Sequence, residues 1–205
     1  MAAPISKKVY IFGHSFVKRL KDFIRQDPSL RYDLGLTGSP MIQYSGFPGA
    51  TVDCLRNKLQ DILDFVPDIV ILVVGTNDIY NPNQSPLSVA SAIRDFVDTL
   101  LFVHGIPRVI VLQTLHRHSP TCHTRYPVDI HWFNNRVDDL NSLLIDWLNS
   151  PPHGRAYLWR LKGFWSPECI RTNFADDGCH LSPRGQHIFF HNIRAAVVAA
   201  LKQSI

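Results

Sequence analysis

The 205-residue sequence contains no long hydrophobic run, and this limits what the chain can be. Its longest apolar stretch, IVILVV at residues 69–74, is far shorter than the roughly 20 residues that a transmembrane helix needs. The first residues, MAAPISKKVYIFG, also lack the apolar segment and the small-residue cleavage site of a secretory signal. We therefore expect a cytoplasmic protein.

Cysteine is scarce, and no Lys/Arg-rich run is present. The four cysteines form no Cys-x-x-Cys pair, which excludes a dense disulfide framework and predicts reduced thiols. The net charge is +4 and the isoelectric point is near 9.0. This mildly basic balance permits contact with nucleic acid or anionic surfaces but does not indicate it, because the positive charge is not clustered.

Internal repeats, low-complexity segments and linkers are absent too, and the length and composition predict a single domain over residues 1–205. What the sequence does contain is an alternation of short apolar runs with amphipathic segments. The apolar runs predict five strands, at residues 8–12, 41–46, 68–75, 108–114 and 156–161. The amphipathic segments predict helices from residue 15, from about residue 51, over 86–104, from about 130 to 149, and from 183.

The run DIVILVVG is apolar at nearly every position, which is typical of a strand buried on both faces of a parallel sheet. Together with the alternating order, it predicts a three-layer α/β/α sandwich with a central parallel sheet of about five strands. The last helix is expected to begin at Ser182 as N-cap with Pro183 in the first turn. In such sheets ligands bind beyond the carboxyl ends of the strands, so chemistry is sought there.

Polar or small residues follow several of these strand ends. Ser15 comes after the first strand, Gly49 after the second and Asn77 after the third, while Asp177 and His180 precede the last helix in DDGCHLSPRG. Each has an ordinary explanation when taken alone. Ser15 could be a simple N-cap, and Gly49 and Asn77 are common turn residues.

The four blocks together resemble the SGNH (GDSL-type) hydrolases over nearly the whole chain, from IFGHS through SGFPGAT and GTND to DGCHLSPRG. The resemblance implies an SGNH/flavodoxin-like fold and a serine esterase that needs no cofactor. It implies Ser15 as nucleophile, His180 as general base and Asp177 as the group that orients His180. The oxyanion donors would be the backbone N–H groups of Ser15 and Gly49 and the side-chain amide of Asn77. Activity should rise with pH as His180 loses its proton.

Two further features bear on this resemblance, the first against it and the second for it. The family has Gly-Asp-Ser where this chain has His14 before the serine, which changes a supporting residue and not a member of the triad. The G-x-S-x-G motif of the α/β-hydrolase nucleophile elbow is absent, and this counts against that other serine-hydrolase fold.

The substrates implied are small or lipid-like acyl esters, acetyl esters included. KVYIFGHSFVKRL is also similar to SGNH esterase domains in the first reading frame of some LINE-type retrotransposons. That similarity implies a larger parent protein associated with nucleic acid or membrane. The rival hypothesis is a binding module, in which an SGNH scaffold binds RNA, lipid or protein and catalysis is incidental.

Three further segments leave alternatives open. Residues 115–123, LHRHSPTCH, collect three histidines and a cysteine, but their spacing fits no zinc pattern, so a solvated loop bordering the cleft is expected. Residues 157–174 mix aromatic and basic side chains, and a strand followed by a loop is preferred there to a base-stacking surface. Met41 is expected in the core and Asp176 in solvent.

Overall fold

The computed structural model describes residues 6–119, 128–150 and 154–202. At its centre is a five-stranded parallel sheet with the strand order β2-β1-β3-β4-β5. The strands are β1 (Lys8–Gly13), β2 (Met41–Gly46), β3 (Ile69–Val73), β4 (Arg108–Leu112) and β5 (Ala156–Trp159). All five lie where the apolar runs predicted them.

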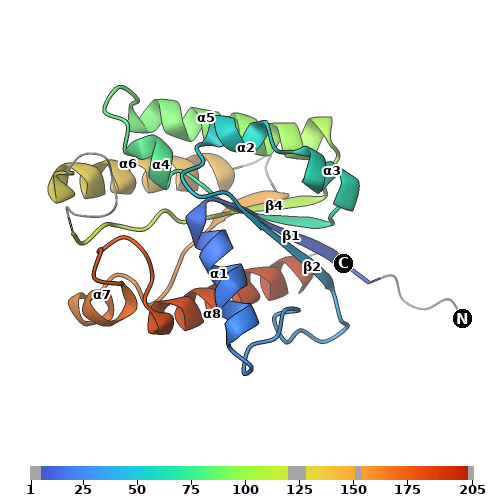
Figure 1. The fold of residues 1–205 in the computed structure, drawn as a ribbon. Helices are drawn as coiled ribbons and strands as arrows, with labels where there is room; N and C mark the ends of the chain where they lie inside the picture. The colour runs from blue at the N-terminus through green and yellow to red at the C-terminus, as the bar shows by residue number, and fades with distance from the viewer. Residues whose placement is uncertain (1–5, 120–127, 151–153, 203–205) are drawn as a thin grey trace, which may run out of the picture.

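Helices cover both faces of the sheet, as Figure 1 shows. On one face lie α1 (Ser15–Gln26) and α8 (Pro183–Lys202), with α7 (Pro167–Asn173) packed against α8. The other face carries α2 (Val52–Arg56), α3 (Gln60–Phe65), α5 (Pro86–Asp98) and α6 (Ile130–Leu148). Each face buries its own hydrophobic core. The predicted three-layer α/β/α fold is confirmed.

The sheet is most deeply buried at its middle. Every residue of β3 is buried, which agrees with its unbroken apolar sequence. By contrast, β2 is an edge strand and only Tyr44 on it is fully buried. The expectation that Met41 lies in the core is wrong: its side chain is 52% exposed, because the first residue of an edge strand has a neighbour on one side only.

Helix boundaries depart from the sequence-based expectation in three places. The helix expected from residue 51 is two short helices, α2 and α3, and Val66 ends the second one with a φ of 52°. The helix expected over 86–104 is α5 followed by a π-helical segment, η1 (Thr99–Val103). The loop expected after β5 contains α7, which Ser166 caps by accepting a hydrogen bond from Cys169 N–H at 3.2 Å.

Two smaller observations complete the fold. A short helix, α4 (Thr76–Ile79), follows β3 directly and contains the asparagine of the GTND motif. Among the helices in the described ranges, none is both long and apolar enough to cross a bilayer.

The carboxyl ends of the three neighbouring strands β2, β1 and β3 lie level with one another. Gly13 at the end of β1 pairs with Gly46 on β2 and with Val73 on β3. At Gly46 the first turn of α1 approaches so closely that a β-carbon would lie 2.1 Å from the backbone nitrogen of Lys18. Glycine at this position therefore lets the start of α1 rest directly on the end of β2.

We predict that Gly46→Ala lowers the free energy of unfolding by about 1–3 kcal/mol, because backbone must move to admit the methyl group. The measurement is urea unfolding followed by circular dichroism. Gly154→Ala is the matched control, since a β-carbon there would have no described heavy atom within 4 Å apart from its chain neighbours, and a change within about 0.5 kcal/mol is expected. Equal effects of the two substitutions would contradict the close approach of α1 to β2.

Candidate active site

A cavity of about 340 Å³ opens where the loops after β1, β2 and β3 meet the turn before α8. Four of the five residues singled out in the sequence line it: Ser15, Gly49, Asn77 and His180. The fifth, Asp177, is hydrogen-bonded to His180. The other lining residues are Phe16, Lys18, Arg19, Pro48, Thr76, Arg117 and Cys179.

Ser15 is the first residue of α1, and its neighbour supplies the cap. The helix is capped by His14, whose Nδ1 accepts a hydrogen bond from Phe16 N–H at 3.4 Å. The simple reading of Ser15 as an N-cap is therefore wrong, and its hydroxyl is not used to start the helix. Within the described residues, no group accepts a hydrogen bond from the backbone N–H of Ser15. That N–H belongs to the positive end of the helix dipole.

The loops after β2 and β3 are joined by two hydrogen bonds next to the cavity. Asn77 Nδ2 donates to the carbonyl oxygen of Ala50 at 2.8 Å, and the backbone N–H of Val52 donates to Asp78 Oδ1 at 2.9 Å. Gly49, with a φ of 75°, stands just before this junction. An amide nitrogen has two hydrogens, so Asn77 keeps one donor beyond its bond to Ala50. The junction fixes the positions of Gly49 and Asn77 relative to each other.

Asp78 is the carboxylate behind this junction. Burial raises the pKa of its carboxyl group to about 6, against the lowering effect of the hydrogen bond from Val52. Its second oxygen, Oδ2, is buried and has no hydrogen-bond partner among the described residues. Asp78 is not among the residues that line the cavity, and it holds the loop after β2 through its bond from Val52.

The stretch DDGCHLSPRG folds into a tight turn that places a carboxylate against an imidazole. Asp177 Oδ2 lies 2.6 Å from His180 Nδ1. Its other oxygen accepts hydrogen bonds from the backbone N–H of Cys179 at 2.9 Å and of His180 at 2.8 Å. Because Asp177 and His180 are three residues apart in a tight turn, the same carboxylate bonds both the ring and the backbone N–H of His180. Asp176 is exposed, as expected.

Neighbouring backbone holds this turn in place. Phe174 and Leu181 form an isolated antiparallel bridge across its base, and His118 N–H donates to the carbonyl oxygen of Gly178 at 2.7 Å. Gly178 has a φ of 61°, and a β-carbon there would lie 2.3 Å from Ser119 N. Only glycine satisfies both the backbone conformation and the contact.

The hydrogen bonds determine the charge of the pair. Burial alone would raise the pKa of Asp177, but the hydrogen bonds from His180 and from the backbone outweigh it and lower this pKa to about 2. Asp177 is therefore ionised at neutral pH and accepts the Nδ1 hydrogen of His180. A neutral imidazole that carries its hydrogen on Nδ1 keeps a lone pair on Nε2, the form a general base requires.

Residues 115–119 are buried or partly buried, which corrects the expectation of a solvated loop, while Arg117 borders the cavity as expected. Arg117 is buried, and His116 Nε2 lies 2.7 Å from Asp138 Oδ1. Cys122 and His123 lie outside the described residues. Over the described ranges, no cluster of three His, Cys, Asp or Glu side chains is suited to bind a metal ion.

A sequence profile of the GDSL-like lipase/acylhydrolase family matches residues 15–188, which run from Ser15 to beyond His180. This chain belongs to that family. Its members hydrolyse esters, so the sequence-based prediction of an ester-hydrolysing enzyme is confirmed at this level. A search among curated proteins found no sequence match.

Solved structures of GDSL-like lipases and related esterases have the same fold. A GDSL-like lipase from Bacteroides thetaiotaomicron is 18% identical, with a TM-score of 0.72 over 98% of this chain and 93% of that one. A lipase/acylhydrolase from Enterococcus faecalis is 19% identical, with a TM-score of 0.67 over 93% and 95%. A carbohydrate esterase family 3 protein from Talaromyces cellulolyticus is 16% identical, with a TM-score of 0.66 over 97% and 100%.

His14 is where this chain departs from the Gly-Asp-Ser of the GDSL-like family. The imidazole is buried, and desolvation, followed by the charges of His180 and Arg117, lowers its pKa to about 3. His14 is therefore neutral throughout the physiological pH range. It keeps the capping function that an aspartate would have but contributes no negative charge.

Sequence reasoning missed Asp78, Arg117 and Asn134 at this site. Asp78 is part of the GTND motif, so its neighbour Asn77 could have directed attention to it. Arg117 lies in the LHRHSPTCH segment, where the histidines and the cysteine suggested a metal site and drew attention away from the arginine. Asn134 clamps Arg117 by donating to its carbonyl oxygen and accepting from its N–H, both at 2.9 Å. No pattern in α6 announces that contact.

The buried neutral His14 makes stability depend on pH. Below about pH 6.5 the unfolded chain protonates this histidine while the folded chain does not until about pH 3, so the unfolded state binds more protons in that interval. The contribution of His14 to the free energy of unfolding therefore falls as the pH drops from about 6.5 towards 3. Between pH 7.5 and 5.0 this single group accounts for a loss of about 2 kcal/mol.

We predict that His14→Asn, which can still cap α1 but cannot titrate, loses less stability between pH 7.5 and 5.0 than the wild type. The measurement is urea unfolding at the two pH values. His191→Asn replaces an exposed histidine on α8 and should keep the wild-type dependence. Parallel behaviour of His14→Asn and wild type would contradict the neutral state of His14.

Proposed function

We propose that this protein is a serine esterase in which Ser15 is the nucleophile, His180 the general base and Asp177 the residue that orients His180. The observation that carries the proposal is the 2.6 Å contact between Asp177 and His180, on a cavity that His180 shares with Ser15. The position of Ser15 at the start of α1, with its hydroxyl unused as a cap, supports the nucleophile assignment.

The proposed reaction proceeds through an acyl-enzyme. His180 Nε2 takes the hydroxyl proton of Ser15 as the Ser15 oxygen attacks the ester carbonyl carbon. The tetrahedral intermediate then collapses, the ester C–O bond breaks, and His180 returns the proton to the departing alcohol. Water, deprotonated by His180, then attacks the acyl carbon, the bond from that carbon to the Ser15 oxygen breaks, and His180 returns the proton to this oxygen as the acid leaves. Asp177 stays ionised throughout and stabilises protonated His180.

The negative charge that develops on the carbonyl oxygen needs hydrogen-bond donors already in place. We assign this function to the backbone N–H groups of Ser15 and Gly49 and to the amide of Asn77. Supporting the assignment, the bonds from Asn77 to Ala50 and from Val52 to Asp78 hold two of these donors in fixed relation. A fixed donor requires little rearrangement when the charge forms.

The substrates we propose are small or lipid-like acyl esters, acetyl esters included. A chain-length series of 4-nitrophenyl esters, assayed with the wild type and with Ser15→Ala, would define the acyl group. The chain shares its fold with a lipase/acylhydrolase and with a carbohydrate esterase, so this fold is compatible both with lipid-like and with small acyl esters.

We predict that a fluorophosphonate probe labels the wild type covalently and that Ser15→Ala abolishes the labelling, because only an activated serine reacts with such a probe. In-gel fluorescence and intact-protein mass spectrometry measure the outcome. Ser88→Ala, in the first turn of α5, is the matched control and should be labelled as the wild type is. Labelling that persists in Ser15→Ala would remove the nucleophile assignment; RNA binding without any labelling would favour the binding-module hypothesis.

We predict that Asn77→Ala lowers kcat on the order of 10²- to 10³-fold with a much smaller change in KM, the scale for one lost oxyanion donor. Steady-state hydrolysis of 4-nitrophenyl acetate provides both constants. Asn83→Ala, at an exposed position whose side chain makes no hydrogen bond within the described residues, should leave them unchanged. A kcat for Asn77→Ala within about twofold of wild type would exclude the amide from the oxyanion hole.

A further inference from the structure

The candidate active site is positively charged. Lys18, Arg19 and Arg117 line the cavity, and no carboxylate is among the described residues that do so. Lys18 is exposed and ion-paired with Asp22 at 2.5 Å, and Arg19 is exposed to solvent. Arg117 differs from both because it is buried.

Two of the three guanidinium nitrogens of Arg117 are buried without a hydrogen-bond partner among the described residues. The residue is 4% exposed, and its Nε and Nη1 atoms are buried with no acceptor among the described residues. The guanidinium carbon lies 4.4 Å from the ring centre of Phe133 and 5.1 Å from that of Tyr80. These rings compensate part of the lost hydration, but they accept no directed hydrogen bond. A buried charge left in this condition is unfavourable without a partner.

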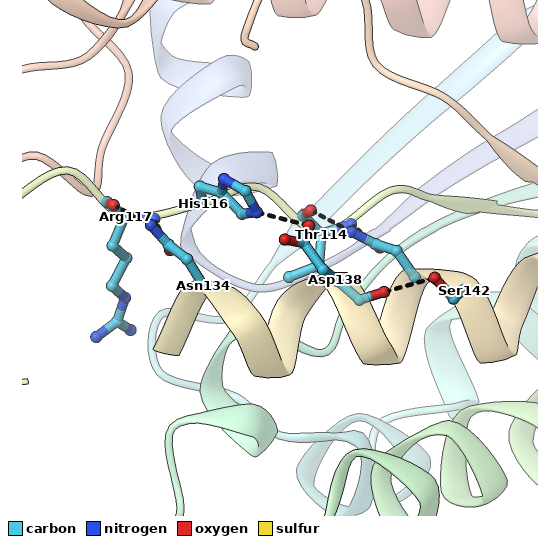
Figure 2. A network of polar contacts seen from close by, with 7 residues as sticks. Thr114, His116, Arg117, Asn134, Asp138 and Ser142 are labelled. Carbon is cyan, nitrogen blue, oxygen red and sulfur yellow. Dashed lines mark hydrogen bonds and ion pairs between the residues drawn. The ribbon is translucent and has the colours of Figure 1, made fainter. Parts of the chain in front are cut away.

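Arg117 is nevertheless held firmly, because α6 grips the backbone on which it stands. Asn134 forms two hydrogen bonds with the backbone of Arg117, and Asn141 forms two with the backbone of Thr114, at 2.9 Å and 3.0 Å respectively. The contact between His116 and Asp138 lies between them. Figure 2 shows Asn134 and Asp138 on α6 facing the segment that carries His116 and Arg117, with the guanidinium extending beyond Asn134. The arginine is thus built into the wall of the cavity.

Residue 14 supplies no negative charge to balance Arg117. The charge of Arg117 acts on His14, whose imidazole is neutral. The Gly-Asp-Ser of the family would place a carboxylate at this position, and its negative charge would attract the positive charge of Arg117. Because His14 is neutral, the positive charge of Arg117 is available to a ligand that enters the cavity.

We infer that Arg117 recognises an anionic group, a carboxylate or a phosphate, on the ester that this enzyme hydrolyses. A guanidinium presents a planar fork of N–H donors that matches the oxygens of either group. The inference rests on the proposed ester hydrolysis and narrows its substrate class. The anion belongs either to the acyl part or to the alcohol part of the ester, and the test separates the two.

The experiment compares isosteric pairs of esters that differ in charge. For the acyl side the pair is the 4-nitrophenyl monoester of glutarate and 4-nitrophenyl 5-methylhexanoate; for the alcohol side it is 4-acetoxybenzoate and 4-acetoxybenzamide. In one of the pairs, Arg117→Gln should lower the anionic-to-neutral ratio of kcat/KM by about 10- to 100-fold, mainly through KM. A structural function of Arg117 would lower both rates equally and leave the ratio unchanged.

Two further variants keep the test informative if Arg117→Gln folds poorly. His14→Asp retains the arginine but supplies an internal carboxylate, so it should also lower the ratio. Arg155→Gln is the matched control, since this guanidinium stacks on Phe102 at 5.1 Å but precedes β5, at the opposite end of the parallel sheet. The control should retain the wild-type ratio. An unchanged ratio in both Arg117→Gln and His14→Asp, for both pairs, would overturn the inference.

Binding measured without turnover separates this inference from the proposed function. By calorimetry, benzoate should bind the wild type more tightly than benzamide does, and Arg117→Gln should remove the difference. If the wild type hydrolyses none of the esters yet shows this difference, the proposed hydrolysis fails and the anion site stands. If it hydrolyses both members of each pair with no dependence on Arg117, the hydrolysis stands and the anion site fails.

Discussion

The parallel pairing of β1 with β2 on one side and β3 on the other determines where Ser15, Gly49 and Asn77 lie. The chain leaves β1, pairs β2 on one side and returns to pair β3 on the other, so the connections diverge at this point and leave a crevice. Because Gly13 is level with Gly46 and Val73, the three following loops start from the same height. Ser15, Gly49 and Asn77 are distant in sequence and meet because the strands before them end together.

The other half of the site depends on α6 and on the turn before α8. Residues 113–118 continue beyond β4 and are fixed by polar side chains of α6. This segment also holds the turn that contains Asp177, because the backbone N–H of His118 donates to the carbonyl oxygen of Gly178. Helix α6 therefore positions both Arg117 and the segment that holds the turn carrying His180. Arg136 of α6 also donates to the carbonyl oxygen of Ile79, which secures α4.

Most of the fold and several of the site residues could be predicted because they leave local marks. Unbroken apolar runs mark buried parallel strands, and Ser182 with Pro183 marks the start of α8, where Ser182 Oγ accepts a hydrogen bond from Gly185 N–H at 3.1 Å. The same Ser-Pro signal stands at residues 166–167, where α7 begins, but the aromatic residues around it favour a loop when only the sequence is considered. Of these aromatic residues, Phe164 packs in the core. Aromatic composition was therefore a poorer guide here than the helix-capping signal of Ser166 and Pro167.

What could not be predicted arises from tertiary contacts without a local pattern. Nothing near Arg117 shows that two rings and an asparagine from α6 will enclose it, and a basic residue between two histidines is ordinarily read as solvated. Asp78 is similar, because a carboxylate after a strand is buried only when another loop folds over it. Exposure is set by the neighbours that a residue acquires, and those neighbours lie far away in sequence.

The capping imidazole of α1 separates two properties that a carboxylate would combine. Aspartate and histidine both begin a helix, yet only the former is an anion at neutral pH, and their codons differ at a single base. A point mutation at residue 14 can therefore change the electrostatic potential at His180 and at Arg117 without replacing either residue. Selection acting on this one position would have a route to new ligands in which none of the residues lining the cavity is replaced.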